Sequence, residues 1–155
     1  MSVKAFPGNS RGGGAKIHAM EVLLVDDQAL TIQVYAASVR KTFSGAKVHM
    51  AVDLPEALQI ASGRALDLVL LDLSLPTCSG IDALYRFRRA FPAVPVLVVS
   101  ANEEKERIQA CLEAGARGYI TKTTAVAGLP EAMKIVLQGG RYMPPNPQGQ
   151  DLHPS

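Results

Sequence analysis

Short apolar runs that end in a polar residue recur along the chain, and stretches with helical periodicity lie between them. The clear runs are residues 22–25, 67–71, 94–99 and 118–121, and residues 48–52 form a weaker fifth. Runs of this length that are rich in β-branched residues and lack polar alternation are typical of strands buried on both faces of a parallel sheet. Because five runs alternate with five helical patterns, the sequence predicts a doubly wound α/β fold.

Capping residues indicate where several of the helices begin or end. Asp53 and Glu56 have the spacing of a capping box at the start of the second predicted helix, and Asn102 is the candidate cap of the fourth. Gly45 follows the first helical pattern, where a left-handed C-terminal residue is favourable. These signals predict separate helices joined to the strands by short connections.

The last helical pattern contains Gly128 and Pro130. A proline is tolerated in the first turn of a helix but not later, because it lacks the N–H that later turns need. We therefore expect this helix to begin near Leu129, after a looser connection, and to end before Gly139.

Length and local composition indicate one folded domain between two tails. A chain of 155 residues has the length of a single domain. Residues 1–19 are rich in glycine and polar residues that bury little apolar surface, so a flexible tail is expected there. Residues 144–155 begin with a proline-rich stretch that is typical of a linker or terminus. The folded domain is predicted to span residues 20–143.

The distribution of charge excludes one broad class of function. The formal net charge is +2, but the three bases of residues 1–20 lie in the predicted tail. Residues 21–143 hold 13 basic and 13 acidic residues, which excludes a folded body that binds DNA through net positive charge. No apolar stretch approaches the ~20 residues of a membrane span. The two cysteines, Cys78 and Cys111, indicate reduced thiols in a cytoplasmic protein.

Polar residues stand at the ends of four of the apolar runs. Asp26 and Asp27 follow the first run, Asp72 follows the third, Ser100 the fourth and Lys122 the fifth. If the strands are parallel, all five residues lie at one edge of the sheet. Ligands of doubly wound sheets bind at this carboxyl edge, so these five residues are the candidate site.

The residue types at this edge suit phosphoryl transfer. Three carboxylates repel one another unless a cation joins them, and Mg²⁺ suits such a set because it needs few carboxylates and keeps several waters. An aspartate can attack phosphorus and form an aspartyl-phosphate, while a lysine supplies positive charge for phosphoryl oxygens. A serine hydroxyl adds one hydrogen bond. Together these groups predict a metal-dependent phosphoryl-transfer site.

Four motifs occur in order along the chain. They are the acidic pair Asp26-Asp27, residues 72–76 with Gly80, residues 98–101, and residues 115–122. With them the chain resembles, over about residues 20–143, the receiver domain of two-component response regulators. Residues 118–122 and 139–145 resemble in particular the NarL/FixJ (LuxR-type) subfamily. The resemblance implies a single (βα)5 flavodoxin-like receiver fold with five parallel strands in the order 2-1-3-4-5.

The resemblance also implies roles for the acidic residues. Asp72 is the implied phosphoacceptor, which takes a phosphoryl group from a sensor histidine kinase. Mg²⁺ is contacted directly by Asp27, Asp72 and the backbone carbonyl of Ser74, and by Asp26 mainly through water.

The remaining implied roles belong to a two-state switch rather than to an enzyme. Lys122 pairs with Asp72 and then with the phosphoryl group, Ser100 bonds a phosphoryl oxygen and moves inward, and the ring of Tyr119 changes its exposure as Ser100 moves. A homodimer formed on phosphorylation is one implied partner. DNA is reached only through an output domain absent from this chain, and no membrane is involved.

Other classes of protein share parts of this pattern. An aspartyl-phosphate hydrolase commonly needs a second acid two residues after its nucleophile, and that position here is Ser74. A flavodoxin-like nucleotide or flavin binder needs a first turn that cradles phosphate, whereas Asp26 and Asp27 repel it. A pseudo-receiver usually lacks site residues that are all present here. A stand-alone receiver acting through protein contacts stays open beside a receiver that controls a transcriptional domain outside this chain.

Overall fold

The sheet of this protein has five parallel strands. The computed structural model describes residues 19–75 and 80–144, and its strands are β1 (Glu21–Val25), β2 (Lys47–Ala51), β3 (Leu68–Asp72), β4 (Val96–Ser100) and β5 (Gly118–Thr121). All neighbouring strands pair in parallel, in the order β2-β1-β3-β4-β5. The predicted doubly wound α/β fold, its strand order and its five strands are confirmed, with strand ends within about two residues.

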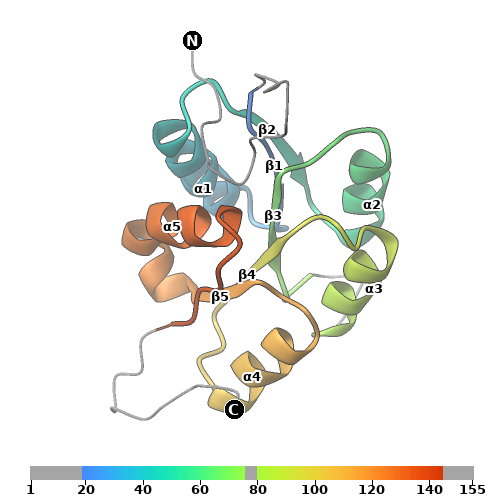
Figure 1. Cartoon of the computed structure of the whole chain (residues 1–155), viewed down its shortest axis with the longest axis vertical. Helices are drawn as coiled ribbons and strands as arrows, with labels where there is room; N and C mark the ends of the chain where they lie inside the picture. The colour runs from blue at the N-terminus through green and yellow to red at the C-terminus, as the bar shows by residue number, and fades with distance from the viewer. Residues whose placement is uncertain (1–18, 76–79, 145–155) are drawn as a thin grey trace.

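Five helices cover the two faces of this sheet (Figure 1). Helices α1 (Ala29–Thr42) and α5 (Lys122–Leu137) lie on one face, and α2 (Leu54–Ser62), α3 (Asp82–Ala90) and α4 (Lys105–Glu113) lie on the other. Alternate residues of β1 serve the two cores: Val22 and Leu24 pack with α1 and α5, whereas Leu23 and Val25 pack with the other three helices. None of the helices in the described ranges is long and apolar enough to cross a bilayer.

The predicted cap of α2 by Asp53 is confirmed, but the return bond of Glu56 goes to the residue before the N-cap rather than to the N-cap itself. Asp53 Oδ1 accepts a hydrogen bond from the N–H of Glu56 at 2.9 Å, and Glu56 Oε1 accepts one from the N–H of Val52 at 2.9 Å. Gly45, after α1, has a φ of 82°, the left-handed conformation expected at a helix C-terminus. These local signals were sufficient because each one satisfies helix-end groups without help from distant residues.

The prediction for the start of α4 was wrong. Asn102 is not its cap; the helix begins at Lys105 and its N-cap residue is Glu104. The Asn102 Oδ1 atom accepts the N–H of Glu104 at 2.7 Å, which forms a turn ahead of the helix. An asparagine side chain that bonds the backbone two residues later favours such a turn over helix.

The prediction for the start of α5 was also wrong. The helix begins at Lys122 and runs through Pro130 to Leu137, instead of beginning near Leu129. Ala125 and Leu129 are fully buried on its inner face, and this burial offsets the cost of the proline, about 3 kcal/mol. The carbonyl that loses its N–H partner is that of Val126, whose side chain is 69% exposed, so water can reach this turn.

Beyond α5 the chain returns to the sheet (Figure 1). Tyr142 pairs in parallel with Gly118 at the outer edge of β5. The N–H of Tyr142 donates to the carbonyl of Arg117 at 3.1 Å, and the N–H of Tyr119 donates to the carbonyl of Tyr142 at 3.0 Å. We call residues 141–143 the exit segment. The sequence did not predict this pairing.

Some predictions fall on residues that the structure does not describe. The predicted tails lie almost wholly outside the described residues, and so does Cys78. The other cysteine, Cys111, is fully buried in α4, and burial raises the pKa of its thiol to about 11. Cys111 is therefore a core residue, as expected from its place in the helical pattern.

Candidate functional site

Three aspartates meet at the carboxyl edge of the sheet. Asp26 and Asp27 directly follow β1, and Asp72 is the last residue of β3, the strand paired with β1. Oxygen atoms of the three carboxylates lie within 4.8 Å of one another. Asp26 and Asp72 are each only 2% exposed, whereas Asp27 is exposed, so the cluster reaches solvent through Asp27.

Asp26 carries a buried charge that the chain compensates only in part. Its Oδ1 accepts the N–H of Gln28 at 2.8 Å, but its Oδ2 has no hydrogen-bond partner among the described residues. Burial raises the pKa of Asp26 above its usual value, the N–H of Gln28 acts against this, and the charge of Asp72 raises the pKa further. A buried acceptor without a donor is rare in folded proteins and indicates a missing ligand or a functional group.

The positive charge of the site comes from the first residue of α5. Lys122 Nζ lies 3.4 Å from Asp72 Oδ2 and 3.7 Å from Asp26 Oδ2. The parallel pairing of β5 with β4 brings Lys122 to the same sheet edge as the acids. Among the described residues, Lys122 pairs with two of the three aspartates of the cluster, so the site remains negative.

Ser74 holds the phosphoacceptor candidate in place. Its N–H donates to Asp72 Oδ1 at 3.1 Å, so the two oxygens of Asp72 have different partners, Ser74 on one side and Lys122 on the other. This division fixes the orientation of the carboxylate at the end of β3.

Ser100, Asn102 and Tyr119 form a chain of hydrogen bonds after β4. Ser100 Oγ accepts the N–H of Asn102 at 3.1 Å, and the carbonyl of Asn102 accepts the hydroxyl of Tyr119 at 2.6 Å. Tyr119 is fully buried, and burial raises the pKa of its phenol. The ring therefore lies inward and is bound to the segment that follows Ser100.

The donor set fits a hard divalent cation. Carboxylate oxygens are the ligands that Mg²⁺ prefers, and three of them lie within 4.8 Å of one another. The Oδ2 of Asp26 is buried without a hydrogen bond among the described residues and has only Lys122 Nζ at 3.7 Å, so a cation bound by the three aspartates would offset the burial and the repulsion that raise the pKa of Asp26.

Two further groups belong to the site although the sequence analysis did not identify them. Thr123 Oγ1 donates to Glu103 Oε2 at 3.0 Å, which links the segment after β4 to the start of α5. Tyr35, on the inner face of α1, has its pKa raised to about 12 by burial and by the charges of Asp26 and Asp72. Neither has a sequence signal, because each depends on residues distant in the chain.

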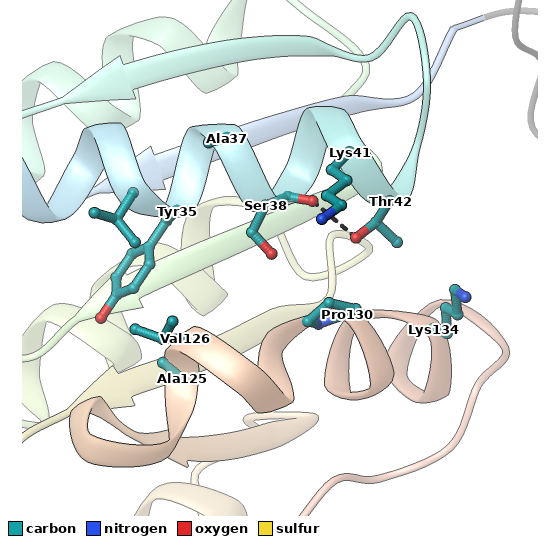
Figure 2. A pocket seen from close by; sticks show the side chains of 10 residues that line it. Tyr35, Ala37, Ser38, Lys41, Thr42, Ala125, Val126, Pro130 and Lys134 are labelled. Atoms are coloured by element: carbon teal, nitrogen blue, oxygen red, sulfur yellow. Dashed lines mark hydrogen bonds between the residues drawn. The ribbon is translucent and has the colours of Figure 1, made fainter.

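A groove of about 470 Å³ lies between α1 and α5 (Figure 2). Tyr35 and Val126 lie at one end of it, and Lys41 and Lys134 lie at the other. Because α1 begins just after Asp27 and α5 begins at Lys122, the end of the groove at Tyr35 and Val126 is the end near the site. Exposed apolar side chains border the groove or lie on the same surface of α1: Leu30, Val34 and Val126.

The sequence matches a known domain family. Residues 22–134 match the response regulator receiver domain. The chain is 32% identical over 127 residues to the glycerol metabolism activator of Pseudomonas putida, which is 81% of this chain and 58% of that protein. The chain thus spans less than two thirds of the length of the curated relatives that it matches.

Solved structures with the same fold agree with this match. A LuxR-family two-component response regulator from Aurantimonas sp. SI85-9A1 is 30% identical, with a TM-score of 0.75 over 81% of this chain and 90% of the other. A LuxR-family DNA-binding response regulator from Silicibacter pomeroyi is 32% identical, with a TM-score of 0.70 over 83% of this chain and 98% of the other.

The family match covers most of the chain, and the strand order and the acidic carboxyl edge agree with it. The predicted resemblance is confirmed, including its LuxR-type character among the structural neighbours. The chain therefore belongs to the response regulator receiver domain family, whose members act as switches in two-component signalling.

Proposed function

We propose that Asp72 accepts a phosphoryl group from a phosphohistidine of a sensor kinase. The observation that carries this proposal is the setting of Asp72: a buried carboxylate at the sheet edge, with Lys122 at 3.4 Å and two further aspartates within 4.8 Å. In the transfer, a carboxylate oxygen of Asp72 attacks phosphorus and the P–N bond breaks. The imidazole nitrogen keeps the electron pair and takes a proton from solvent.

The surrounding residues neutralise and orient the charge of this transfer. Mg²⁺, held by Asp26, Asp27, Asp72 and the backbone carbonyl of Ser74, supplies positive charge to the phosphoryl oxygens when it is bound. Lys122 moves its ion pair from Asp72 to the phosphoryl group. Because Ser74 stands where hydrolases carry an acid, the proposed role is a phosphoacceptor switch and not an enzyme of steady turnover.

Asn102 connects the phosphoryl group to the switch. Ser100 Oγ accepts the Asn102 N–H in this structure, and the same hydroxyl is the proposed donor to a phosphoryl oxygen. When Ser100 turns toward the phosphoryl group, it leaves the N–H of Asn102, whose carbonyl holds the hydroxyl of Tyr119. The charge at Asp72 thereby changes the position of Tyr119 through two hydrogen bonds.

The groove between α1 and α5 is the proposed contact surface for the kinase. A phosphohistidine must reach Asp72, so the donor protein has to cover a surface next to the site. The exposed apolar side chains of Leu30, Val34 and Val126 fit the apolar stripe of a partner helix. The helix would approach from the Tyr35 end of the groove.

The output proposed for the full protein is control of transcription in the cytoplasm. Two similar proteins are named a transcriptional activator and a DNA-binding response regulator, and the chain spans 58% of the length of the first. DNA would be contacted by a domain outside this chain, and a homodimer formed on phosphorylation is part of the same proposal. A stand-alone receiver acting by protein contacts is the alternative.

Mass spectrometry of the intact protein tests the phosphoacceptor directly. The protein is incubated with a small phosphodonor, such as acetyl phosphate or phosphoramidate, with and without Mg²⁺. We expect the mass of one phosphoryl group in the wild type with Mg²⁺, and none in Asp72→Asn.

The matched control is Asp67→Asn, which alters an aspartate at the opposite edge of the sheet and should be labelled like the wild type. Equal labelling of Asp72→Asn and the wild type would contradict the assignment. A labelled Asp72→Ala protein would contradict it as well.

A further inference from the structure

The outer edge of β5 holds a short strand of the same chain. Two backbone hydrogen bonds join Tyr142 of the exit segment to Tyr119 of β5 at 3.0 Å and to Arg117, just before β5, at 3.1 Å, and they flank the pair of Gly118 with Tyr142. Tyr142 packs against the core beneath α1 and α5, whereas Met143 packs against the core beneath α2, α3 and α4. The segment thus contacts both layers of the molecule, as a strand of the sheet does.

Gly118 makes room for this strand. A Cβ atom at Gly118 would lie 3.1 Å from Tyr142 Cβ and 3.2 Å from the Tyr142 carbonyl oxygen, tighter than most contacts of a Cβ atom, so Tyr142 would have to move outward slightly. It would also lie 2.8 Å from Leu97 Cδ1, the flexible end of a side chain that can turn away. A side chain at position 118 therefore displaces the exit segment and weakens its pairing with β5.

A backbone conformation, a hydrogen bond and a close approach shape the turn that leads into the segment. Gly139 has a φ of 91°, which a residue with a side chain adopts at a cost, and its carbonyl accepts Arg117 Nη1 at 3.3 Å. Gly140 lies so close to Ile135 that a Cβ atom would be 3.2 Å from the Ile135 carbonyl oxygen. The turn is shaped to return the chain to β5.

The strand is bound to the backbone of the switch residue itself. The N–H that donates to Tyr142 belongs to Tyr119, whose ring points into the core against which Met143 packs. At its other end, the ring donates its hydroxyl to the carbonyl of Asn102. Tyr119 therefore takes part in two interactions, one with the exit segment and one with the segment after Ser100.

We propose that the β5 edge is a strand-binding site whose occupancy by the exit segment and the buried position of Tyr119 stabilise each other. Because the coupling is reciprocal, loss of either interaction weakens the other by the same factor. With the proposed function, on which this part rests, a phosphoryl group on Asp72 would change the docking of the exit segment through Ser100, Asn102 and Tyr119. The position of the exit segment would thus depend on whether Asp72 is phosphorylated, and the chain that follows the segment would move with it.

Amide exchange and tyrosine NMR test this coupling in the 155-residue protein without any phosphodonor. In Gly118→Ala we expect the amide exchange of Tyr142 to rise by about 10-fold or more, and the ring signal of ¹³C-labelled Tyr119 to shift toward its exposed value. Gly63→Ala is the matched control, because a Cβ at Gly63 meets nothing within 4 Å and its φ is −104°. It should change neither readout.

Two more variants keep the test decisive if Gly118→Ala disturbs Leu97. Tyr142→Pro removes the N–H that donates to Arg117 without adding an atom to β5, and it should shift the Tyr119 ring signal in the same direction. Tyr119→Phe removes the hydroxyl bond to Asn102, and it should raise exchange of the Tyr142 amide. If exchange at residue 142 stays as in the wild type in Tyr119→Phe, or the Tyr119 ring signal stays unchanged in Tyr142→Pro, the coupling does not exist.

A last measurement separates this inference from the proposed function. Amide exchange at Tyr142 is compared before and after addition of acetyl phosphate and Mg²⁺. A change that follows the added phosphoryl mass and is absent in Asp72→Asn supports the reporter role. Full phosphorylation without any change at Tyr142 overturns that role, whereas absence of phosphorylation overturns the proposed function and leaves the mutational coupling to stand on its own results.

Discussion

Acidic side chains at the two ends of the sheet differ in whether their oxygen atoms find hydrogen-bond partners. At the amino end, Asp67 Oδ2 accepts the N–H of Glu21 at 2.8 Å, and Glu21 Oε1 lies 3.0 Å from His49 Nε2. At the carboxyl end, Asp26 Oδ2 is buried with no hydrogen-bond partner among the described residues, and its pKa is raised. The acids of the amino end form hydrogen bonds that stabilise the folded chain, whereas Asp26 at the carboxyl end keeps a buried negative charge that the protein neutralises only in part.

This difference separates structural charge from functional charge. A carboxylate that bonds backbone N–H groups and a nearby base stabilises the strand ends by itself. A carboxylate that repels its neighbours is stable only when a further group, such as Mg²⁺, joins it. Substitutions at the two ends should therefore have opposite effects, and this contrast can be tested.

The largest effect is expected at Lys122, which forms ion pairs with Asp26 and Asp72. Lys122→Ala removes positive charge 3.4 Å from Asp72, so labelling by a small phosphodonor should slow by about 100-fold. Lys134→Ala, near the other end of α5, is the control and should leave the rate unchanged. Rates are measured from the phosphorylated mass fraction over time, and equal slowing in both variants would contradict the role of Lys122.

The stability of two asparagine variants should differ in sign. Asp26→Asn keeps the acceptor for the Gln28 N–H and removes the repelled charge, so the free energy of unfolding without metal should rise by about 1–3 kcal/mol. Asp67→Asn replaces a charge-assisted bond by a neutral one and should lower it by about 0.5–1 kcal/mol. Urea unfolding at pH 7 measures both, and a destabilised Asp26→Asn protein would remove the contrast.

The effect of Mg²⁺ should depend on pH. The pKa of Asp26 is raised by burial above its ordinary value of 3.8, so between the ordinary and the raised value the folded protein binds more protons than the unfolded chain. Its metal-free stability therefore falls as pH rises through this window. Mg²⁺ binds the ionised form, so its stabilisation should grow with pH and reach about 1.4 kcal/mol at ten times Kd. Thermal unfolding at pH 5 and pH 7 checks this, and Asp26→Asn should flatten the difference.

The last of the expected effects concerns a single hydrogen bond of the switch ring. Tyr119→Phe removes the hydroxyl bond to the carbonyl of Asn102, which should lower the free energy of unfolding by about 1 kcal/mol. Tyr85→Phe, at a ring that is 53% exposed, should leave it unchanged. Urea unfolding of both variants decides between them; a loss of the same size in Tyr85→Phe would mean that the Tyr119 bond contributes nothing specific.

Apolar runs and the residues that follow them were sufficient to predict the sheet and the residues at its functional edge. Asp26, Asp72 and Lys122 were predicted to meet because parallel strands bring their carboxyl ends together, and the distances confirm that they do. The start of α5 was not predictable from Pro130 alone, since the burial of Ala125 and Leu129 outweighs the local preference of proline. Tertiary packing of the helix thus outweighs the local tendency of proline to end a helix.

Other features had no local signal at all. The pairing of Tyr142 with Gly118 joins residues separated by the whole of α5, and a single paired residue leaves no periodic pattern. The bond of Tyr119 to Asn102 likewise depends on how β5 packs against the segment after β4. The sequence could predict which residues gather at the site, but not which hydrogen bonds connect them.

The direction of the exit segment has a consequence for anything attached to the receiver. Because Tyr142 pairs in parallel with Gly118, the chain leaves the sheet heading toward the edge where Asp72 lies. A domain tethered just after Pro144 therefore meets that edge at an effective concentration in the millimolar range for a short flexible tether. Contacts far too weak to form between separate molecules can be substantially populated in such a tethered pair, so the tether's length becomes a means of tuning the response.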